Sequence, residues 1–412
     1  MRVHARAMAV MAAALVLGAG VVACGGDDEA DSGSGGGETT AAAKDTSPIV
    51  IGAAIDQTDF MKFFDGPALT AAQIRAEEIN AAGGVNGRKI EFSVQNTQLK
   101  PDRTRAAALE LAEKGADILW VTCDVDFSTP SAQVGIAKGL LTIAPCIGTD
   151  QMGPKRFGEK GKLAFSYGNV AQDEGAALAE LAKERGFQTA TVVTDKSIAF
   201  TTNVCQAFTK RFEKNGGTTT QESFTQGDKT INRVVSKVNR TKSDTIALCT
   251  ITQNDLPAFV SGVRGAGNKT PIMGPWSIDG AFWLPKSKTV ADNILLTTYA
   301  SIYGDDPDPK VQALIDEMTA KDQAPATGGF VTGAAVIDGI VEAVKKNGGS
   351  TDGAKLAATM EGFSGLKTIS GAISFSPEFH TAFGRTYRVI EIKGGKPAYA
   401  GEISAGEPEP LT

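Results

Sequence analysis

The sequence has very few histidines. Of its 412 residues only two are histidine, His4 and His380, and His4 lies in a segment that we expect to be removed. One remaining histidine cannot supply a metal site built from several imidazoles. A Ser-His-Asp triad would have to use His380, which we expect at the surface. We therefore predict no catalytic residues, no metal and no cofactor.

The chain also lacks an excess of positive charge. Its 41 Lys and Arg stand against 47 Asp and Glu, and the net charge of −6 disfavours nonspecific binding to nucleic acid or anionic lipid. Apolar residues make up 42% and charged residues 21%, so the chain is neither a disordered polymer nor a fibre. At roughly 100–200 residues per domain, the length predicts two domains, or three.

Long apolar runs are missing beyond the N-terminus. There, Arg2 and Arg6 precede a run over 7–23 without a charged residue, and the run ends in Val-Val-Ala before Cys24. A basic start, a short apolar core and a small residue before the cut predict a signal peptide over 1–23. The Val-Val-Ala-Cys sequence resembles the lipobox of bacterial lipoproteins, which implies that Cys24 is acylated. An ordinary signal peptide or an uncleaved anchor is the alternative.

Residues 24–48 have no apolar periodicity and are rich in Gly, Ser and acidic residues. Such a segment cannot bury enough surface to fold, so we predict a flexible tether. Together with the lipid anchor, the tether predicts an extracytoplasmic protein that is held at the cell membrane.

Five cysteines occur in the sequence, and four remain after Cys24. An even number in an oxidising compartment predicts disulfides. Of the possible pairings we prefer Cys123–Cys146 and Cys205–Cys249, because each pair would join neighbouring elements in one half of the chain. A zinc site is disfavoured, since no two of these cysteines form a Cys-x-x-Cys pair.

From residue 49 onwards, short apolar runs alternate with stretches of helical period. The first run, IVIGAAI, is followed by Leu69, Ala72 and Ala76 at helical spacing, and Gly83 and Gly84 would end that helix as left-handed caps. Two such series predict an α/β fold with two doubly wound lobes. The predicted strands are 49–55, 89–95, 117–122, 140–145, 189–194, 218–224, 244–250 and 271–274, and the predicted helices are 67–81, one from 101, 130–138, 172–186, 203–215, 229–239 and 253–265.

The last third of the chain departs from this alternation. Helical stretches at 307–320, 328–346 and 351–361 come with few strands, and 385–392 and 396–403 read as a β-hairpin around Gly-Gly. Late segments that return to the first lobe would place several crossovers between the lobes, and these would form a hinge.

Several segments match one known family. AEEINAAGGVNGRKIEF at 76–92 resembles the leucine/isoleucine/valine-type solute-binding lipoproteins of ABC transporters, which have the type I periplasmic-binding fold. The resemblance implies two lobes that close around a ligand, joined by crossovers near 166–171, 298–303 and 372–378. The other matching segments are LLTIAP (140–145), VVTDK (192–196), RGAGNKTPIMG (264–274) and TGGFVTGAAVIDGIVEAV (327–344). The implied domains are an N-terminal lobe of 49–168 plus 300–374, a C-terminal lobe of 169–299 plus 375–405, and a tail of 406–412.

The matching positions imply candidate ligand contacts. Cys146 and Gly148 fall where the family has a small residue and a threonine that bind the ligand carboxylate, and Asn169 lies near the crossover aspartate that holds the ammonium. Trp276 stands at an acidic position of the family. The candidates are Phe64, Asp126, Phe127, Ser128, Cys146, Gly148, Asn169, Phe200, Thr252, Trp276 and Phe330.

The departures from the family pattern concern polar groups. Gly148 has no hydroxyl, Trp276 has no carboxylate, and Ala171 stands near the crossover acid. Asp126 remains as one candidate acid, although it could be a solvated loop residue, and Trp276 could simply pack in its loop. An aromatic cleft with few polar groups suits a small amphipathic molecule. Branched-chain amino acids, aromatic or other organic acids, and amides all remain open.

The sequence therefore predicts a monomeric solute-binding protein that delivers its ligand to an ABC permease in the membrane. One rival is a sensory module of the same fold that signals to a membrane receptor, and a neighbouring permease gene would decide against it. A second rival, an extracytoplasmic enzyme, is disfavoured by the histidine count.

Overall fold

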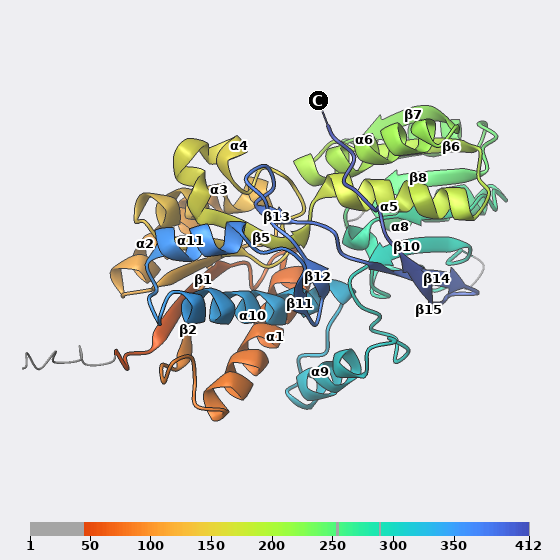
Figure 1. Cartoon of the computed structure of the whole chain (residues 1–412). Coiled ribbons are helices and arrows are strands. Elements are labelled where there is room, and N and C mark those ends of the chain that lie inside the picture. Colours follow the sequence, from red (N-terminus) through yellow and green to blue (C-terminus); the bar gives the residue numbers. More distant parts are fainter. Residues whose placement is uncertain (1–44, 253–254, 288–289, 412) are drawn as a thin grey trace, which may run out of the picture. The chain divides into compact units, whose positions relative to one another are not determined.

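The computed structural model describes residues 45–252, 255–287 and 290–411. The predicted signal peptide, Cys24 and most of the predicted tether lie outside the described residues. Residues 45–412 form one compact unit, in which the described residues build two large sheets flanked by helices (Figure 1). The predicted α/β fold with two lobes is therefore confirmed.

The N-terminal lobe is built on a sheet whose described strands number six, in the order β13-β5-β4-β3-β1-β2. All neighbouring strands in it are parallel. Parallel strands that are buried on both faces are nearly continuous apolar runs, as the first strand of the chain is. The strands are β1 (Ile49–Ile55), β2 (Ile90–Asn96), β3 (Ile118–Val121), β4 (Leu141–Ala144), β5 (Ala164–Asn169) and β13 (Thr381–Ala382).

The C-terminal lobe contains a sheet of seven described strands, in the order β15-β14-β10-β9-β8-β6-β7. Five of these are parallel, whereas β14 runs antiparallel to both β10 and β15, as the predicted hairpin requires. The strands are β6 (Thr189–Asp195), β7 (Thr218–Phe224), β8 (Thr245–Cys249), β9 (Ile272–Gly274), β10 (Ile294–Thr298), β14 (Tyr387–Lys393) and β15 (Lys396–Ile403). A separate pair consists of β11 (Leu366–Thr368) and β12 (Gly371–Ile373).

Helices cover both faces of each sheet (Figure 1). In the N-terminal lobe α1, α10 and α11 pack on one face and α2 and α3 on the other. In the C-terminal lobe α5 and α6 lie on one face and α7 and α8 on the other. The helices are α1 (Lys62–Ala81), α2 (Pro101–Glu113), α3 (Val125–Ala137), α4 (Pro154–Phe157), α5 (Ala171–Glu184), α6 (Ala199–Lys214), α7 (Ile231–Val238), α8 (Asp255–Gly265), α9 (Pro309–Ala320), α10 (Val331–Lys346) and α11 (Gly353–Glu361), with short 3₁₀ turns η1 (Gly158–Leu163), η2 (Trp276–Ile278) and η3 (Gly328–Phe330).

Three helices begin four or five residues earlier than predicted. Helix α6 begins at Ala199 instead of residue 203, and the other two contain a proline. Helix α1 begins at Lys62 and α3 at Val125, and each contains an interior proline, Pro67 and Pro130. Proline is most common in the first helical turn, so the prediction began each helix at its proline or close to it. In the structure each proline lies only just past the first turn, where it removes a single backbone hydrogen bond.

The end of α1 agrees with the prediction. Gly83 and Gly84 have φ angles of 103° and 76°, in the left-handed region. The Gly84 N–H donates to the carbonyl oxygen of Ile79 at 2.9 Å. This contact satisfies one of the carbonyl groups that a helix end leaves without an intrahelical partner.

The chain crosses between the lobes after β5, after β10, and between β13 and β14. The first two crossovers lie where they were predicted, but the third does not, because Thr381 and Ala382 pair with β5. Residues 375–382 therefore belong to the N-terminal lobe. His380, predicted at the surface, is buried in this segment, where its ring stacks on Phe165 with 4.2 Å between centroids.

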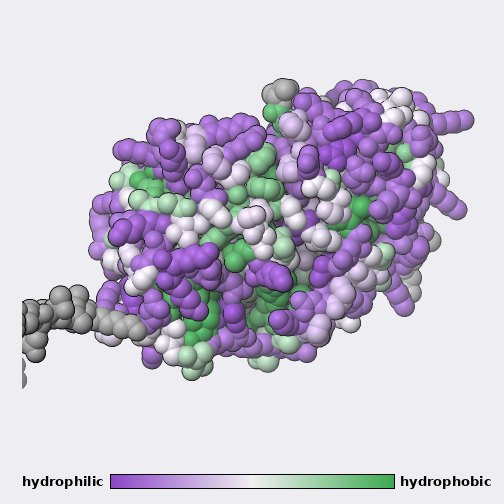
Figure 2. Space-filling model, viewed as in Figure 1, coloured by the Kyte–Doolittle hydropathy of each residue, from purple (hydrophilic) through white to green (hydrophobic). Residues whose placement is uncertain are grey.

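The face of the molecule seen in Figure 2 is mainly hydrophilic, and hydrophobic residues appear on it in small separate patches. Among the described residues, Phe282 is the one large apolar side chain that is exposed, at 44%. No helix in the described part of the chain has both the length and the apolar character needed to cross a membrane.

Candidate ligand-binding cleft

A narrow cavity lies between the two lobes. Its residues follow the carboxyl ends of β1, β3 and β4 in the N-terminal lobe and of β6, β8 and β9 in the C-terminal lobe. This end of a parallel sheet is where open α/β folds bind ligands. About 30 Å³ of it is open to the centre of a water molecule, which is room for one or two waters. The lining residues are Phe60, Met61, Phe64, Cys123, Asp124, Phe127, Cys146, Gly148, Ile198, Phe200, Ile251, Trp276 and Ser277.

Aromatic rings from both lobes meet in the cavity. Trp276 of the C-terminal lobe makes an edge contact with Phe64 of the N-terminal lobe at 5.3 Å between centroids, and another with Phe200 at 6.2 Å. The same indole stacks on Tyr299 at 5.4 Å. Each of these pairs adds roughly 0.5–1.5 kcal/mol beyond simple burial. Trp276 therefore links the two lobes through apolar contacts.

Polar side chains at the cavity are few. The Asp124 carboxylate accepts the backbone N–H groups of Asp126 and Phe127 and so caps α3. Burial, and next the charge of Asp126, raise the pKa of Asp124 to about 7. The Ser277 hydroxyl donates to the carbonyl oxygen of Thr250 at 2.7 Å. None of the described lining residues is Lys, Arg or His.

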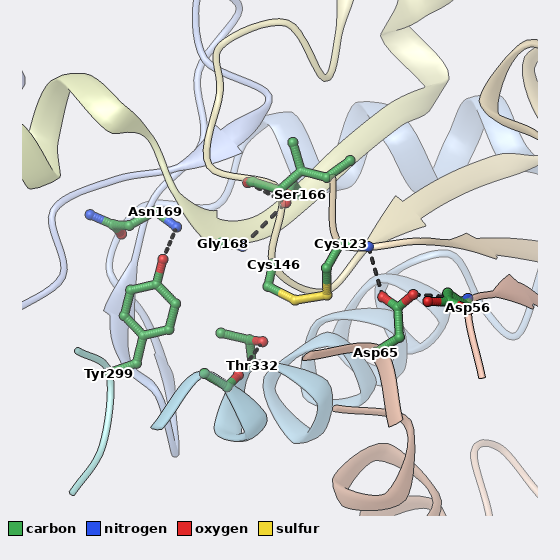
Figure 3. Close-up of a disulfide and its surroundings, with 11 residues drawn as sticks. Asp56, Asp65, Cys123, Cys146, Ser166, Gly168, Asn169, Tyr299 and Thr332 are labelled. Atoms are coloured by element: carbon green, nitrogen blue, oxygen red, sulfur yellow. Dashed lines mark hydrogen bonds between the residues drawn. A yellow bond between two sulfur atoms is a disulfide. The ribbon is translucent and has the colours of Figure 1, made fainter. Parts of the chain in front are cut away.

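A disulfide forms part of the cavity wall. Cys123 and Cys146 are bonded, and they join the loops that follow β3 and β4 (Figure 3). The Asp65 carboxylate of α1 accepts the backbone N–H of Cys123 at 2.8 Å and that of Asp56 at 2.9 Å. Burial raises the pKa of Asp65 to about 8. The disulfide and Asp65 therefore fix the loops after β1, β3 and β4 relative to one another.

The second disulfide lies away from the cavity. It joins Cys205 on α6 to Cys249 at the end of β8, both buried within the C-terminal lobe. The two bonds are those that the sequence analysis preferred.

The structure brings some of the predicted contact residues to the cavity and leaves others outside it. Ser128 is buried within α3, Thr252 is partly exposed, and Phe330 is buried beyond the cavity lining. Asp126 is not a lining residue, and its carboxylate contacts Arg156 at 3.0 Å and the backbone N–H of Ala199 at 3.2 Å. The predicted residues that line the cavity are Phe64, Phe127, Cys146, Gly148, Phe200 and Trp276.

Asn169, also predicted as a contact, belongs instead to a buried cluster at the crossovers. Its backbone N–H donates to the Tyr299 hydroxyl at 3.0 Å (Figure 3), and its side chain contacts Asp173 and the Tyr387 hydroxyl. The Arg385 guanidinium lies 4.3 Å above the Tyr299 ring. These residues come from all three crossovers, so the cluster ties them together beneath the cavity.

Glu174, which follows Asp173 of this cluster on α5, connects the cluster to the cavity. Oε1 of Glu174 accepts the backbone N–H of Trp276 at 2.8 Å and the Thr297 hydroxyl at 3.0 Å. Burial raises the pKa of Glu174 to about 8, partly opposed by these two hydrogen bonds. The backbone of Trp276 is thus held by a side chain at the start of α5.

The sequence analysis missed several lining residues. Asp124 could have been recognised as a helix cap, because Asp is a preferred N-cap residue, but the helix was predicted to begin only at Pro130. The others lie within four residues of a predicted contact in the same segment. The missed residues are Phe60, Met61, Asp124, Ile198, Ile251 and Ser277, and Cys123 was predicted only as a disulfide partner.

Comparison with known proteins identifies the family of this two-lobed fold. The family model described as periplasmic binding protein matches residues 48–396. The chain belongs to the periplasmic binding protein family. A curated relative of this binding protein is the leucine-, isoleucine-, valine-, threonine- and alanine-binding protein of Pseudomonas aeruginosa. It is 23% identical over 307 residues, which cover 74% of this chain and 79% of the relative.

Solved structures of binding proteins share the fold. The branched-chain amino acid transporter substrate binding protein of Streptococcus pneumoniae, in complex with isoleucine, matches with a TM-score of 0.74 and 17% identity over 87% of this chain and 99% of that one. A solute binding protein of an ABC transporter from Rhodopseudomonas palustris, in complex with 3,4-dihydroxybenzoic acid, matches with a TM-score of 0.72 and 17% identity over 88% and 99%.

Proposed function

We propose that the chain is an extracytoplasmic solute-binding lipoprotein of an ABC importer. It captures a small amphipathic solute between its two lobes and presents it to a permease in the membrane. The observation that carries this proposal is the cavity itself, which both lobes line with aromatic side chains at the carboxyl ends of their strands.

The relatives support a transport role. The Streptococcus pneumoniae protein is named for a branched-chain amino acid transporter, and the Rhodopseudomonas palustris protein for an ABC transporter. Their ligands, isoleucine and 3,4-dihydroxybenzoic acid, each combine an apolar body with a polar head. The apolar cleft of this chain suits the same general shape of solute.

The lining supports binding without chemistry. The Ser277 hydroxyl is engaged with a backbone carbonyl group, and the described lining residues include no histidine or lysine that could act as its base. Since the cavity has room for one or two waters, a larger solute enters only when the lobes part. A solute that binds the closed form more tightly than the open form then shifts the equilibrium toward the closed form. The size of this shift is set by the difference between the two binding free energies.

The cell-envelope location rests on the sequence. A signal peptide over 1–23 and acylation of Cys24 would hold the binding unit at the membrane through the tether. The two disulfides support an oxidising compartment. We propose that the protein acts there as a monomer.

A thermal-shift screen of the purified chain tests the binding function. The panel contains amino acids, aromatic acids and amides, because a specific ligand raises the melting temperature by mass action. We expect Trp276→Ala to weaken binding of any hit while the protein stays folded, since Trp276 joins the lobes at the cavity. No hit from the whole panel would contradict the proposed function, and unchanged affinity in Trp276→Ala would remove this residue from the site.

A further inference from the structure

The proposed solute-binding function leaves the chemistry of the solute open. The two helix ends at the cavity limit which chemical classes of solute would fit. Helix α3 from one lobe and α6 from the other both begin there, because Phe127 and Phe200 in their first turns line the cavity. The free N–H groups and the dipole at a helix N-terminus favour an anion. These two helix ends are therefore where the carboxylate of an acidic ligand would bind.

Carboxylates of the protein already occupy both helix ends. Oδ1 of Asp124 accepts the N–H groups of Asp126 and Phe127, at 2.9 and 3.3 Å. Oδ2 of Asp126 accepts the N–H of Ala199, the first residue of α6, at 3.2 Å. A ligand carboxylate would have to displace these groups, and it would also be repelled by their charge.

A ligand carboxylate would find no cation of its own in the described part of the cavity lining, since the nearby charge of Arg156 already acts on Asp124 and Asp126. The described lining residues contain no basic side chain. Arg156 lies close to Asp126, but it is bound to the Asp126 carboxylate at 3.0 Å and to the side chain of Gln151 at 2.6 Å. Moving a carboxylate out of water without a paired cation is costly. The cavity is therefore poorly suited to an acid.

Two polar atoms at the cavity remain available. Trp276 is 4% exposed, and its Nε1–H has no partner in the part of the chain that the structure describes. Asp124 is 6% exposed, and its Oδ2 accepts no hydrogen bond from the described residues. An unused donor and an unused acceptor in an apolar cavity match a ligand head group that contains both N–H and C=O.

We propose that the cleft binds small primary amides with an aromatic or branched aliphatic body, and that it rejects the corresponding carboxylic acids. The amide N–H donates to Asp124 Oδ2, and the amide carbonyl accepts from Trp276 Nε1. An amide is uncharged, so it needs no cation. Its apolar body contacts the rings of Phe64 and Phe200.

Matched amide and acid pairs test this proposal with the full chain. The probes are phenylacetamide with phenylacetate, and isovaleramide with isovalerate, measured by thermal shift and by calorimetry. The assay runs at pH 8, above the pKa of about 7 that burial gives Asp124. We expect both amides to bind at least about tenfold more tightly than their acids. An acid that binds as tightly as its amide, or amides that do not bind, would overturn the proposal.

Variants separate the role of each polar atom. Asp124→Asn keeps the helix cap, because Asn caps as well as Asp, but it removes the charge. We expect it to weaken amide binding and to bring the amide and acid affinities closer together. Trp276→Phe keeps the ring and removes the N–H, and should also weaken amide binding. Ser236→Ala is the control, because this exposed hydroxyl on α7 also donates to a backbone carbonyl group but lies outside the cavity lining, and it should leave the amide-to-acid ratio unchanged. An unchanged ratio in Asp124→Asn would show that the proposal is wrong.

The outcomes distinguish this proposal from the proposed function. If leucine, isoleucine or benzoate binds and the amides do not, the amide proposal fails but solute binding stands. If no solute of the broad panel binds, the proposed function itself fails.

Discussion

Asp126 of the N-terminal lobe accepts a hydrogen bond, at 3.2 Å, from the backbone N–H of Ala199 in the C-terminal lobe. The other oxygen of the same carboxylate is held by Arg156 at 3.0 Å. Asp126 therefore places a negative charge on the N-terminus of α6 across the cleft. This contact exists only while the lobes are together, so it stabilises the closed form.

Removing this contact should favour the open form. A charge at an exposed helix N-terminus contributes about 0.3–1 kcal/mol, so we expect Asp126→Ala to weaken ligand binding about two- to fivefold. Small-angle scattering of the ligand-free protein should show a larger radius of gyration. Asp102→Ala is the control, because Asp102 occupies the first turn of α2 within one lobe. Equal effects of the two variants would contradict the role of Asp126 in closure.

Gly148 is required for close approach of the lobes. A Cβ at this position would lie 2.4 Å from Cε2 of Phe200 in the other lobe. We expect Gly148→Ala to cost about 1–3 kcal/mol of closed-state stability, which lowers affinity about fivefold or more in calorimetry. Gly66→Ala on α1 is the control, because nothing lies within 4 Å of its added Cβ. In a Phe200→Ala background, Gly148→Ala should lower ligand affinity much less. If the effects of the two substitutions on affinity were fully additive, a clash between the two side chains would be excluded.

The two disulfides should differ in their effect on binding. Replacing either pair with serine should lower the free energy of unfolding by about 2–4 kcal/mol, measured by denaturant titration. Only the Cys123→Ser/Cys146→Ser variant should also lose ligand affinity at temperatures where it is folded, because this bond forms the cavity wall. Cys205→Ser/Cys249→Ser is the matched control. Loss of affinity in both variants, or in neither, would contradict this division.

The buried Glu174 should make stability depend on pH. Burial raises its pKa from 4.5 to about 8, so the folded state keeps a proton that the unfolded state releases between these values. Stability should therefore fall as pH rises from about 4.5 to 8. Glu174→Gln keeps the shape without the charge, and its denaturant midpoint should fall less between pH 5 and pH 8. Glu184→Gln, at the exposed end of the same helix, is the control. Equal slopes for wild type and Glu174→Gln would contradict this account.

The alternation of strands and helices could be predicted from the sequence, because parallel strands and amphipathic helices have distinct apolar periods. It was misleading at Pro67 and Pro130, where helix packing tolerates the loss of one hydrogen bond. It also did not identify β13 as part of the first sheet. That strand has two residues, and its place depends on pairing with β5, far away in the chain.

The sequence predicted which loops form the candidate site, but it did not predict which residues of each loop line the cavity. Trp276 and Phe200 were identified because they match ligand-contact positions of the family that the sequence resembles. Which residues of each loop line the cavity depends on how the loops are held, and the contact of Asp65 with Cys123 is invisible in the sequence pattern. The same holds for Asp126, whose partner Ala199 lies 73 positions away.

Asn169, Tyr299 and Tyr387 come from three separate crossovers and are joined by hydrogen bonds and ring contacts at one place. Rotation of the lobes about that place would keep these contacts, whereas translation of one lobe past the other would break them. How far the lobes swing apart is then set by residues that do not touch the solute. Two proteins with the same cleft lining but different side chains at these three positions would release the same solute at different rates.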